Sequence, residues 1–279
     1  MCDCTLRDGG YYTNWHFSKE LMQNYLKSMD KININFIEIG FRFLEKKEIY
    51  GNNAYCKDEF LKTFDIPKNL NIAVMLKAEE VFLKDANIQK NLDYLFEDSK
   101  KSPVDVVRIA APYQKAPECQ EITEILRNKG YKISLNLTKL FLAEEKEILK
   151  TVKKINAWNS FDILYFADTY GNLSVKQVKN IISIMQAECN KPLGFHSHNN
   201  TGLALINSLA AIEKKINYVD STVAGMGRGA GNLPTETILK EIDNKKDCKE
   251  LSALIKNYFL PLKLKYKWGY NLLEEIIIG

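Results

Sequence analysis

The sequence predicts an α/β fold, a (β/α)8 TIM barrel with a short C-terminal helical extension. First, short β-rich runs alternate with longer stretches of helical periodicity along nearly the whole chain. Second, the β-rich runs are almost continuously apolar, as expected for strands that are covered on both faces. Third, eight strand-and-helix units in about 240 residues match a TIM barrel, whereas a doubly wound sheet of five or six strands would leave some runs unplaced.

The expected strands are apolar runs bounded by polar or turn-forming residues. They lie at residues 2–6, 33–39, 70–76, 104–110, 131–137, 161–167, 192–197 and 217–224. Helical periodicity covers residues 18–29, 79–97, 118–129, 139–156, 174–188 and 201–215. Serine or threonine precedes several of these helices, as N-caps prefer: Ser18, Thr138, Ser174 and Thr201. The second unit is the weakest, because residues 41–62 are loop-rich with only a short helix near 57–63.

These elements predict a barrel domain over residues 1–244 and a helical extension over residues 245–279. The extension ends in the apolar segment EEIIIG. Three interpretations of it stay open at this point: a packing helix, a contact in a homodimer, or a truncated end.

The composition argues against nucleic acids and membranes as binding partners. With 39 basic and 35 acidic residues the net charge is +4, which gives no broad field to attract nucleic acid. The chain has no N-terminal apolar segment after a basic start, and no uncharged run nears the ~18 residues that span a bilayer. We therefore expect a cytoplasmic protein without nucleic-acid or membrane partners. Its six cysteines lack metal-type spacing, so reduced thiols are expected.

Polar residues gather where the expected strands end and the following loops begin. In a TIM barrel this is the face that carries the active site. The residues at these positions are Arg7, Asp8, Glu38, Lys77, Arg108, Asn136, Asp168, Thr169, His196, His198 and the glycine-rich loop 225–232. The starts of the strands carry mostly Asn, Pro or Lys at turns, so the concentration at the ends indicates a functional face.

Two of the three histidines lie in the segment GFHSHNN. Positions i and i+2 of a strand point to the same side, so His196 and His198 share one face. In a closed barrel the eighth strand lies beside the first, which brings Asp8 within reach of both. Two imidazoles and a carboxylate are a common set of ligands for a divalent metal. For the histidine pair by itself, hydrogen-bonded packing is an equally good interpretation.

The glycine loop GMGRGAGN also has two interpretations. Its glycines permit positive φ and close backbone approach, which suits a bound anion and equally suits a turn that closes the barrel. Its spacing does not match a P-loop or a dinucleotide fingerprint. Asn232 at its end offers a further oxygen to a metal.

Taken together, these residues form a set ordered along the barrel: Arg7-Asp8-Gly9, Glu38, His196-x-His198 and Gly231-Asn232. The set resembles the 3-hydroxy-3-methylglutaryl-CoA (HMG-CoA) lyase-like superfamily of metal-dependent TIM-barrel lyases and synthases, the DRE-TIM metallolyases. That group includes 4-hydroxy-2-oxovalerate aldolase, isopropylmalate and homocitrate synthases, and the carboxyltransferase domain of pyruvate carboxylase. The resemblance covers roughly residues 3–240 and is closest to the 4-hydroxy-2-oxovalerate aldolase-like branch.

The resemblance implies roles for these residues. Asp8, His196 and His198 would hold a divalent ion such as Mn²⁺ or Mg²⁺, with Asn232 as a fourth ligand. Arg7 would be the catalytic cation, and Glu38 would orient it or a metal-bound water.

The chemistry of enolates explains why a metal site and an arginine would occur together. Making or breaking a carbon–carbon bond next to a 2-keto acid requires an enolate, which a divalent Lewis acid and an arginine donor stabilise. Arginine stays protonated, so it stabilises negative charge well and accepts protons poorly. The sequence therefore predicts an aldolase, a metal-dependent carbon–carbon lyase acting on a pyruvate-type 2-keto acid and an aldehyde through a metal-bound enolate.

The sequence departs from the best-known members in three places. Gly10, Tyr11 and Tyr12 take the place where the 4-hydroxy-2-oxovalerate aldolases have a histidine shortly after the Arg-Asp pair, and Tyr11 is the candidate for its role. It would transfer a proton if its pKa were lowered near the metal, or else form a wall of the pocket. Arg228 replaces the cysteine of the CoA-ester lyases, and it binds a phosphate or second carboxylate or is a solvated residue. The Glu-Gln that follows the pair in the synthases is absent.

The remaining substrate-binding candidates follow the expected strand ends: Asp168, Thr169, Asn136, Arg108, Gly227 and Arg228. Two other functions stay open. One is a Claisen-condensing acyl-CoA synthase of the isopropylmalate synthase type, which would release free CoA thiol. The other is a catalytically inactive barrel that serves as a binding or scaffold subunit.

Overall fold

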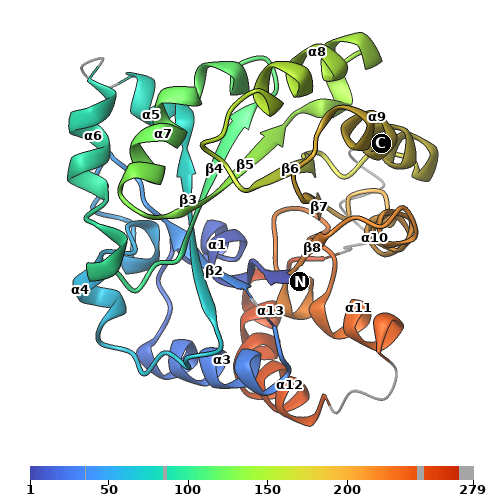
Figure 1. Cartoon of the computed structure of the whole chain (residues 1–279). Coiled ribbons are helices and arrows are strands. Elements are labelled where there is room, and N and C mark those ends of the chain that lie inside the picture. The colour runs from blue at the N-terminus through green and yellow to red at the C-terminus, as the bar shows by residue number, and fades with distance from the viewer. Residues whose placement is uncertain (35, 84–86, 244–247, 270–279) are drawn as a thin grey trace.

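Eight parallel strands close into a barrel, in the order β1 to β8, in the computed structural model (Figure 1). The structure describes residues 1–34, 36–83, 87–243 and 248–269. The strands are β1 (Cys2–Asp3), β2 (Phe36–Phe41), β3 (Asn71–Lys77), β4 (Val106–Pro112), β5 (Lys132–Thr138), β6 (Ile163–Asp168), β7 (Leu193–Ser197) and β8 (Tyr218–Ser221). Pairing of Cys2 with Asp220 joins the first strand to the last. The predicted TIM barrel is confirmed.

Helices surround the barrel (Figure 1). They are α3 (Lys19–Lys31), α4 (Asp58–Leu61), α5 (Ala78–Leu83), α6 (Ile88–Leu95), α7 (Gln120–Asn128), α8 (Glu145–Asn156), α9 (Val175–Glu188), α10 (Ala204–Glu213) and α11 (Thr235–Ile242). Their apolar faces pack against the outward-facing residues of the strands, such as Ile109 and Phe166, which are fully buried. The helices cover the outer face of the sheet and closure of the barrel encloses its inner face, which explains why the strand sequences are almost continuously apolar.

The first strand is much shorter than expected. Only Cys2–Asp3 pair in the sheet, and the chain then turns into α1 (Thr5–Asp8) and α2 (Gly10–Thr13). The buried carboxylate of Asp3 causes the turn, because it accepts the backbone N–H of Thr5 at 3.0 Å and the hydroxyl of Tyr25 at 2.6 Å. Arg7 and Asp8 therefore lie on a helical turn rather than at a strand tip.

Several other boundaries differ from the prediction. The expected helix at 79–97 is two helices, α5 and α6. Ser18 and Ser174 cap α3 and α9 as predicted, each accepting a backbone N–H three residues on. Thr138 and Thr201 do not cap helices, because longer loops separate them from α8 and α10.

The fourth strand begins later than predicted. It covers Val106–Pro112, which places Arg108 in its middle rather than at its end. Glu38 likewise lies in the middle of β2. Both side chains therefore belong to the interior of the barrel, below its C-terminal mouth.

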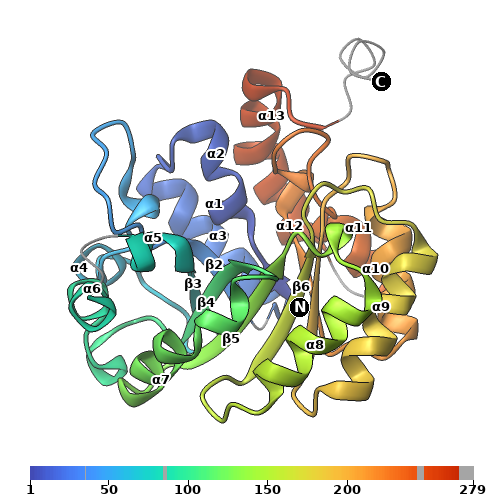
Figure 2. The same cartoon turned by 90° about the horizontal axis from the view of Figure 1, so that it is seen from above.

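The C-terminal extension is helical where it is described, with α12 (Lys249–Leu254), the π-helical segment η6 (Ile255–Phe259) and α13 (Leu260–Tyr266). The rings of Tyr266 and Trp268 lie 6.1 Å from that of Tyr12, so α13 stands beside α2 (Figure 2). The predicted domain boundary between residues 244 and 245, like the segment EEIIIG, lies outside the described residues. In the described part of the chain, no helix is long and apolar enough to cross a bilayer.

Candidate metal centre and active site

Three side chains from distant parts of the sequence converge at the mouth of the barrel. Asp8 comes from α1, His196 from β7, and His198 from the loop that follows β7. One ligand atom from each lies within 4.8 Å of those of the other two. Nε2 of His196 lies 3.3 Å from Oδ2 of Asp8. The structure thus brings together the carboxylate and the two imidazoles that the sequence singled out.

Both imidazoles are held through their Nδ1 atoms. Nδ1 of His196 lies 2.9 Å from Oδ2 of Asp220, and Nδ1 of His198 lies 2.8 Å from the backbone oxygen of Asp168. An acceptor at Nδ1 places the proton there and leaves Nε2 with a free lone pair. This is the orientation of metal-binding histidines.

A second observation supports a cation at this point. Nε2 of His196 is buried and makes no hydrogen bond within the described residues, although it faces the carboxylate of Asp8. Burial acts to lower the pKa of His196, but its contacts with Asp220 and Asp8 outweigh burial and raise the pKa. A positive charge between Nε2 and this carboxylate, either a proton or a bound cation, would satisfy both atoms.

His198 and Asp8 have the protonation states that metal ligands need. Burial, reinforced by His196, lowers the pKa of His198 to about 4, so its ring is neutral at pH 7. Burial acts to raise the pKa of Asp8, but Arg7 and His196 outweigh it and hold the pKa well below its usual value.

Asn232 completes the group. Its Nδ2 donates to Oδ2 of Asp8 at 2.6 Å, and its Oδ1 is buried without a hydrogen-bond partner in the described residues. Gly227 packs directly behind this amide, since a Cβ there would come 2.7 Å from the Asn232 side chain. Gly227 therefore supports Asn232 and does not line the cavity, contrary to the substrate-binding role predicted for it. A carboxylate, two imidazoles and an amide oxygen fit a divalent cation.

Arg7 is fixed between two carboxylates. Its Nε donates to Oε2 of Glu38 at 2.6 Å, and its Nη1 pairs with Asp8. Burial acts to lower the pKa of Arg7, but Asp8 and Glu38 raise it well above the usual value, so the guanidinium stays charged. The side chain also lines the cavity above the centre.

The pairing continues through the inside of the barrel. Oε1 of Glu38 lies 3.2 Å from Nη1 of Arg108, and Nη2 of Arg108 donates to Oδ2 of Asp220 at 2.6 Å. The six charged or ionisable side chains form one closed ring, in the order Arg7, Glu38, Arg108, Asp220, His196 and Asp8. Arg108 is only 2% exposed and does not line the cavity, so its predicted contact with substrate is wrong.

Sequence reasoning missed Asp220. The available signal was an acidic residue inside the apolar run NYVDSTVA of the eighth strand. Buried carboxylates need partners, so its position called for a cation or an imidazole on a neighbouring strand.

A cavity of about 590 Å³ opens at this mouth, and His196, His198 and Arg7 form part of its lining. Asn136, Thr169, Tyr11 and Arg228 line it as well, consistent with their predicted location.

One prediction about this mouth is corrected. Asp168 does not line the cavity, because its carboxylate turns back to accept the N–H groups of Asn172 and Leu173 at 3.1 and 3.2 Å. Tyr11 forms part of the cavity wall, and burial is the largest cause of its raised pKa.

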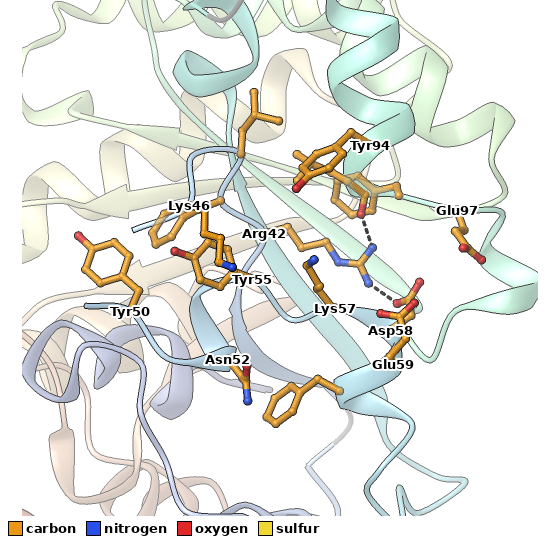
Figure 3. Close-up of a pocket in the computed structure, with 15 residues that line it drawn as sticks. Arg42, Lys46, Tyr50, Asn52, Tyr55, Lys57, Asp58, Glu59, Tyr94 and Glu97 are labelled. Atoms are coloured by element: carbon orange, nitrogen blue, oxygen red, sulfur yellow. Dashed lines mark hydrogen bonds and ion pairs between the residues drawn. The ribbon is translucent and has the colours of Figure 1, made fainter. Parts of the chain in front are cut away.

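A second cavity of about 480 Å³ lies between the loop after β2 and the end of α6 (Figure 3). Its buried cation, Arg42, is already held by Asp58 and by the backbone oxygen of Leu95 at 2.7 Å. None of the converging metal-site residues line it.

Cys2, Cys4 and Asp220 form another group of potential ligands beneath the centre. Arg108 already supplies the cation there, with Nη1 3.1 Å from the sulfur of Cys4. The cavity above Asp8 and the two histidines is therefore the candidate active site.

Comparisons with known proteins identify similar sequences and folds. The HMGL-like family model matches residues 1–257. A 4-hydroxy-2-oxovalerate aldolase of Carboxydothermus hydrogenoformans is 30% identical over 86% of this chain and 69% of its own. An oxaloacetate decarboxylase of Mycobacterium tuberculosis is 24% identical over 88% of this chain and 70% of its own.

Solved structures show the same fold. The N-terminal domain of an aldolase-like protein from Bacteroides vulgatus superposes with a TM-score of 0.83 and 33% identity, covering 97% of this chain and 89% of that one. A Bacillus subtilis HMG-CoA lyase has a TM-score of 0.74 over 99% of this chain and 96% of its own, at 13% identity.

Proposed function

The chain belongs to the HMGL-like family, and we propose that it is a divalent-metal-dependent aldolase that joins or separates a 2-keto acid and an aldehyde. Curated relatives named as aldolases and as a decarboxylase of keto acids support a carbon–carbon lyase. The proposal adds the ion, the residues and the reacting partners. Pyruvate is the keto acid that we expect. The cytoplasmic location and the homodimer stay predictions.

One observation carries the proposal: buried donor atoms that lack partners meet at one point. One ligand atom each from Asp8, His196 and His198 lies within 4.8 Å of the other two. Nε2 of His196 and Oδ1 of Asn232 make no hydrogen bond among the described residues, and the Asn232 amide adjoins the group because its Nδ2 donates to Oδ2 of Asp8. We assign these four side chains as the ligands of Mn²⁺ or Mg²⁺. When bound, the ion supplies a Lewis acid for negative charge that develops on a keto oxygen.

Arg7 is the catalytic cation in this proposal. Its guanidinium is anchored by Asp8 and Glu38 while the side chain lines the cavity, so a donor is in place before the reaction starts. Hydrogen bonds from such a donor strengthen as charge develops on the keto oxygen, and losing one costs about 10²–10³ in rate. Glu38 acts as a positioning residue for Arg7.

Tyr11, Asn136 and Thr169 surround the reacting groups. Burial raises the pKa of Tyr11, which favours the protonated phenol as a hydrogen-bond donor toward the substrate. Asn136 and Thr169 offer further polar contacts from β5 and from the loop after β6.

The test is proton exchange at C3 of pyruvate in D₂O. We expect exchange that depends on added Mn²⁺, and a loss of about 10²–10³ in rate in Arg7→Ala. The exposed Lys27→Met on α3 removes a positive charge far from the mouth and serves as the control. Exchange that is absent with metal, or unchanged in Arg7→Ala, would contradict the proposal.

Analysis of the reaction products and of bound metal distinguishes this function from the alternative functions. Release of free CoA thiol from an acyl-CoA and a 2-keto acid would identify a synthase. Release of CO₂ from oxaloacetate without aldol cleavage would identify a decarboxylase. Purified protein without stoichiometric divalent metal, even after incubation with Mn²⁺, would favour the scaffold interpretation.

A further inference from the structure

One wall of the 590 Å³ cavity is aromatic and carries cations. The guanidinium carbon of Arg228 lies 4.2 Å from the centre of the Tyr11 ring. That ring meets Phe41 edge-on, with centroids 6.2 Å apart. Nζ of Lys77 lies 5.4 Å from the centre of the same Phe41 ring. Two rings in contact therefore hold Lys77 and Arg228 on one surface.

These two cations lack strong acidic partners. Arg228 makes no ion pair within the described residues. In the described part of the chain, Lys77 forms an ion pair only with Glu80, at 3.9 Å, and the other carboxylate oxygen of Glu80 accepts the N–H of Leu44 at 3.1 Å. Aromatic faces attract a cation without neutralising it. The charges of Lys77 and Arg228 thus remain available to a ligand.

The lining of the cavity as a whole carries more positive than negative side chains. Its cations are Arg7, Lys77, Lys139 and Arg228, and its carboxylate is Glu79. Arg7 is compensated by Asp8 and Glu38. Burial lowers the pKa of Lys77, and the positive charge of Arg228 adds to that effect. An anion between the two cations would relieve this repulsion.

Solvation alone is a weaker explanation for Lys77. The residue ends a barrel strand, and its side chain is only 39% exposed because it lies over two rings, Phe41 and Phe43. A lysine with no ligand to bind would lose hydration here without forming a short ion pair. Its place on the cavity wall is instead suited to contact with substrate.

We propose that Lys77 and Arg228 form a subsite for an anionic group, a carboxylate or a phosphate ester, on the aldehyde partner. The inference rests on the proposed function, because the keto acid occupies the metal centre and the aldehyde takes the rest of the same cavity. A volume of about 590 Å³ lies within the ~300–1,000 Å³ typical of small-molecule pockets, which leaves room for a charged tail.

The experiment compares matched aldehydes in condensation with pyruvate. C3 of pyruvate loses a proton and bonds to the aldehyde carbon, whose oxygen gains a proton, so no further reactant is needed. Glycolaldehyde phosphate is compared with glycolaldehyde, and succinic semialdehyde with butanal. The measured quantity is the ratio of kcat/KM for the anionic aldehyde to that for the neutral one.

We expect the wild-type ratio to exceed about 10 for at least one pair, because an ion-assisted contact discriminates by about 10- to 100-fold. Arg228→Met and Lys77→Met should each lower that ratio about tenfold or more, and Lys27→Met should preserve it. The preference should also fall as salt is added, because both cations are partly exposed. A preference seen only with glycolaldehyde phosphate identifies the anionic group as a phosphate, and one seen only with succinic semialdehyde identifies it as a carboxylate.

Wild-type ratios near 1 for both pairs of aldehydes, at low and at high salt, would overturn the inference. So would ratios that Arg228→Met and Lys77→Met leave unchanged. Calorimetric Mn²⁺ binding by each variant checks that the centre is intact, and the wild-type ratios decide the matter even if a variant fails to fold. Absence of Mn²⁺-dependent pyruvate exchange would instead refute the proposed function itself, so the two failures are distinct.

Discussion

Asp220 holds His196 by a hydrogen bond: its Oδ2 lies 2.9 Å from Nδ1 of the imidazole, and both side chains are buried. The carboxylate comes from β8 and the imidazole from β7, so the contact crosses two neighbouring strands. It sets the tautomer of His196 and aims Nε2 at Asp8. Through Arg108, the same oxygen of Asp220 is also linked to Glu38 and Arg7.

Asp220→Asn should weaken Mn²⁺ binding by about 10- to 100-fold, because partners that orient metal-binding histidines have effects of that size. The amide can still accept from Nδ1, but it has lost the charge that polarises the ring. Isothermal titration calorimetry with Mn²⁺ measures the change. The exposed Asp65→Asn is the matched control, and equal affinities for the two variants would contradict the role of Asp220.

Arg7→Lys should lower the rate of pyruvate exchange by about 10²–10³, although the positive charge is kept. A lysine cannot bridge Glu38 and Asp8 with a planar fork, so it cannot be held in the same place. The loss should appear mainly in kcat, because the contact strengthens in the transition state. A variant with wild-type kcat would show that the guanidinium geometry is irrelevant.

Arg108→Met should lower the free energy of unfolding by about 3–5 kcal/mol, since it leaves Glu38 and Asp220 buried without their cation. Urea denaturation measures the change. Lys31→Met provides the comparison, because Lys31 and Glu250 form an ion pair whose side chains are 57% and 50% exposed. That pair should contribute less than about 1 kcal/mol. Similar losses in the two variants would argue against a buried charge ring.

Gly227→Ala and Asn232→Ala should both reduce Mn²⁺ affinity, because the methyl group added at Gly227 would displace the amide that lies 2.7 Å away. We expect a loss of about tenfold for either change. Gly227 does not have a positive φ, so backbone strain adds nothing to this substitution. Calorimetry tests the effect, and circular dichroism should show an unchanged fold. Full affinity in Gly227→Ala would remove Asn232 from the ligand set.

Thiol reactivity should distinguish one cysteine from the other five. Burial raises the pKa of Cys119 to about 12 and raises those of Cys4, Cys56 and Cys189 as well. At pH 8 these four thiols stay protonated, and Cys2 is buried like them, whereas only an accessible thiolate attacks a disulfide reagent. Ellman's reagent should therefore titrate Cys248 alone in the folded protein and all six cysteines in guanidinium chloride. Rapid reaction of a second thiol at pH 8 would contradict the packing.

The architecture of the barrel was predictable because its signals are local. Apolar runs of strand length and helical periodicity depend on neighbours within a few residues, and burial of both faces of the sheet marks every strand. Boundaries were less predictable. The early end of β1 depends on Asp3, whose carboxylate binds Thr5, Tyr25 and Thr235 from three parts of the chain.

The candidate site was predictable only in part. Asp8, His196, His198 and Asn232 stood out because a carboxylate, a His-x-His pair and an amide oxygen are ligand types for a divalent metal. Asp168 also stood out, yet its carboxylate serves its own loop. Position at a strand end reports which face a residue occupies, whereas the direction of its side chain depends on the hydrogen bonds that the loop needs.

By itself, the sequence determined the strand-and-helix order, the apolar faces and part of the set of polar residues at the mouth, since each follows from local periodicity and residue chemistry. Only the tertiary structure decided which charges meet. Arg108 and Asp220 are 112 positions apart, and their contact depends on the register of eight strands around a closed barrel. The same register places Lys77 and Arg228 on one aromatic wall, because pairing across a barrel is a property of the whole sheet rather than of any segment.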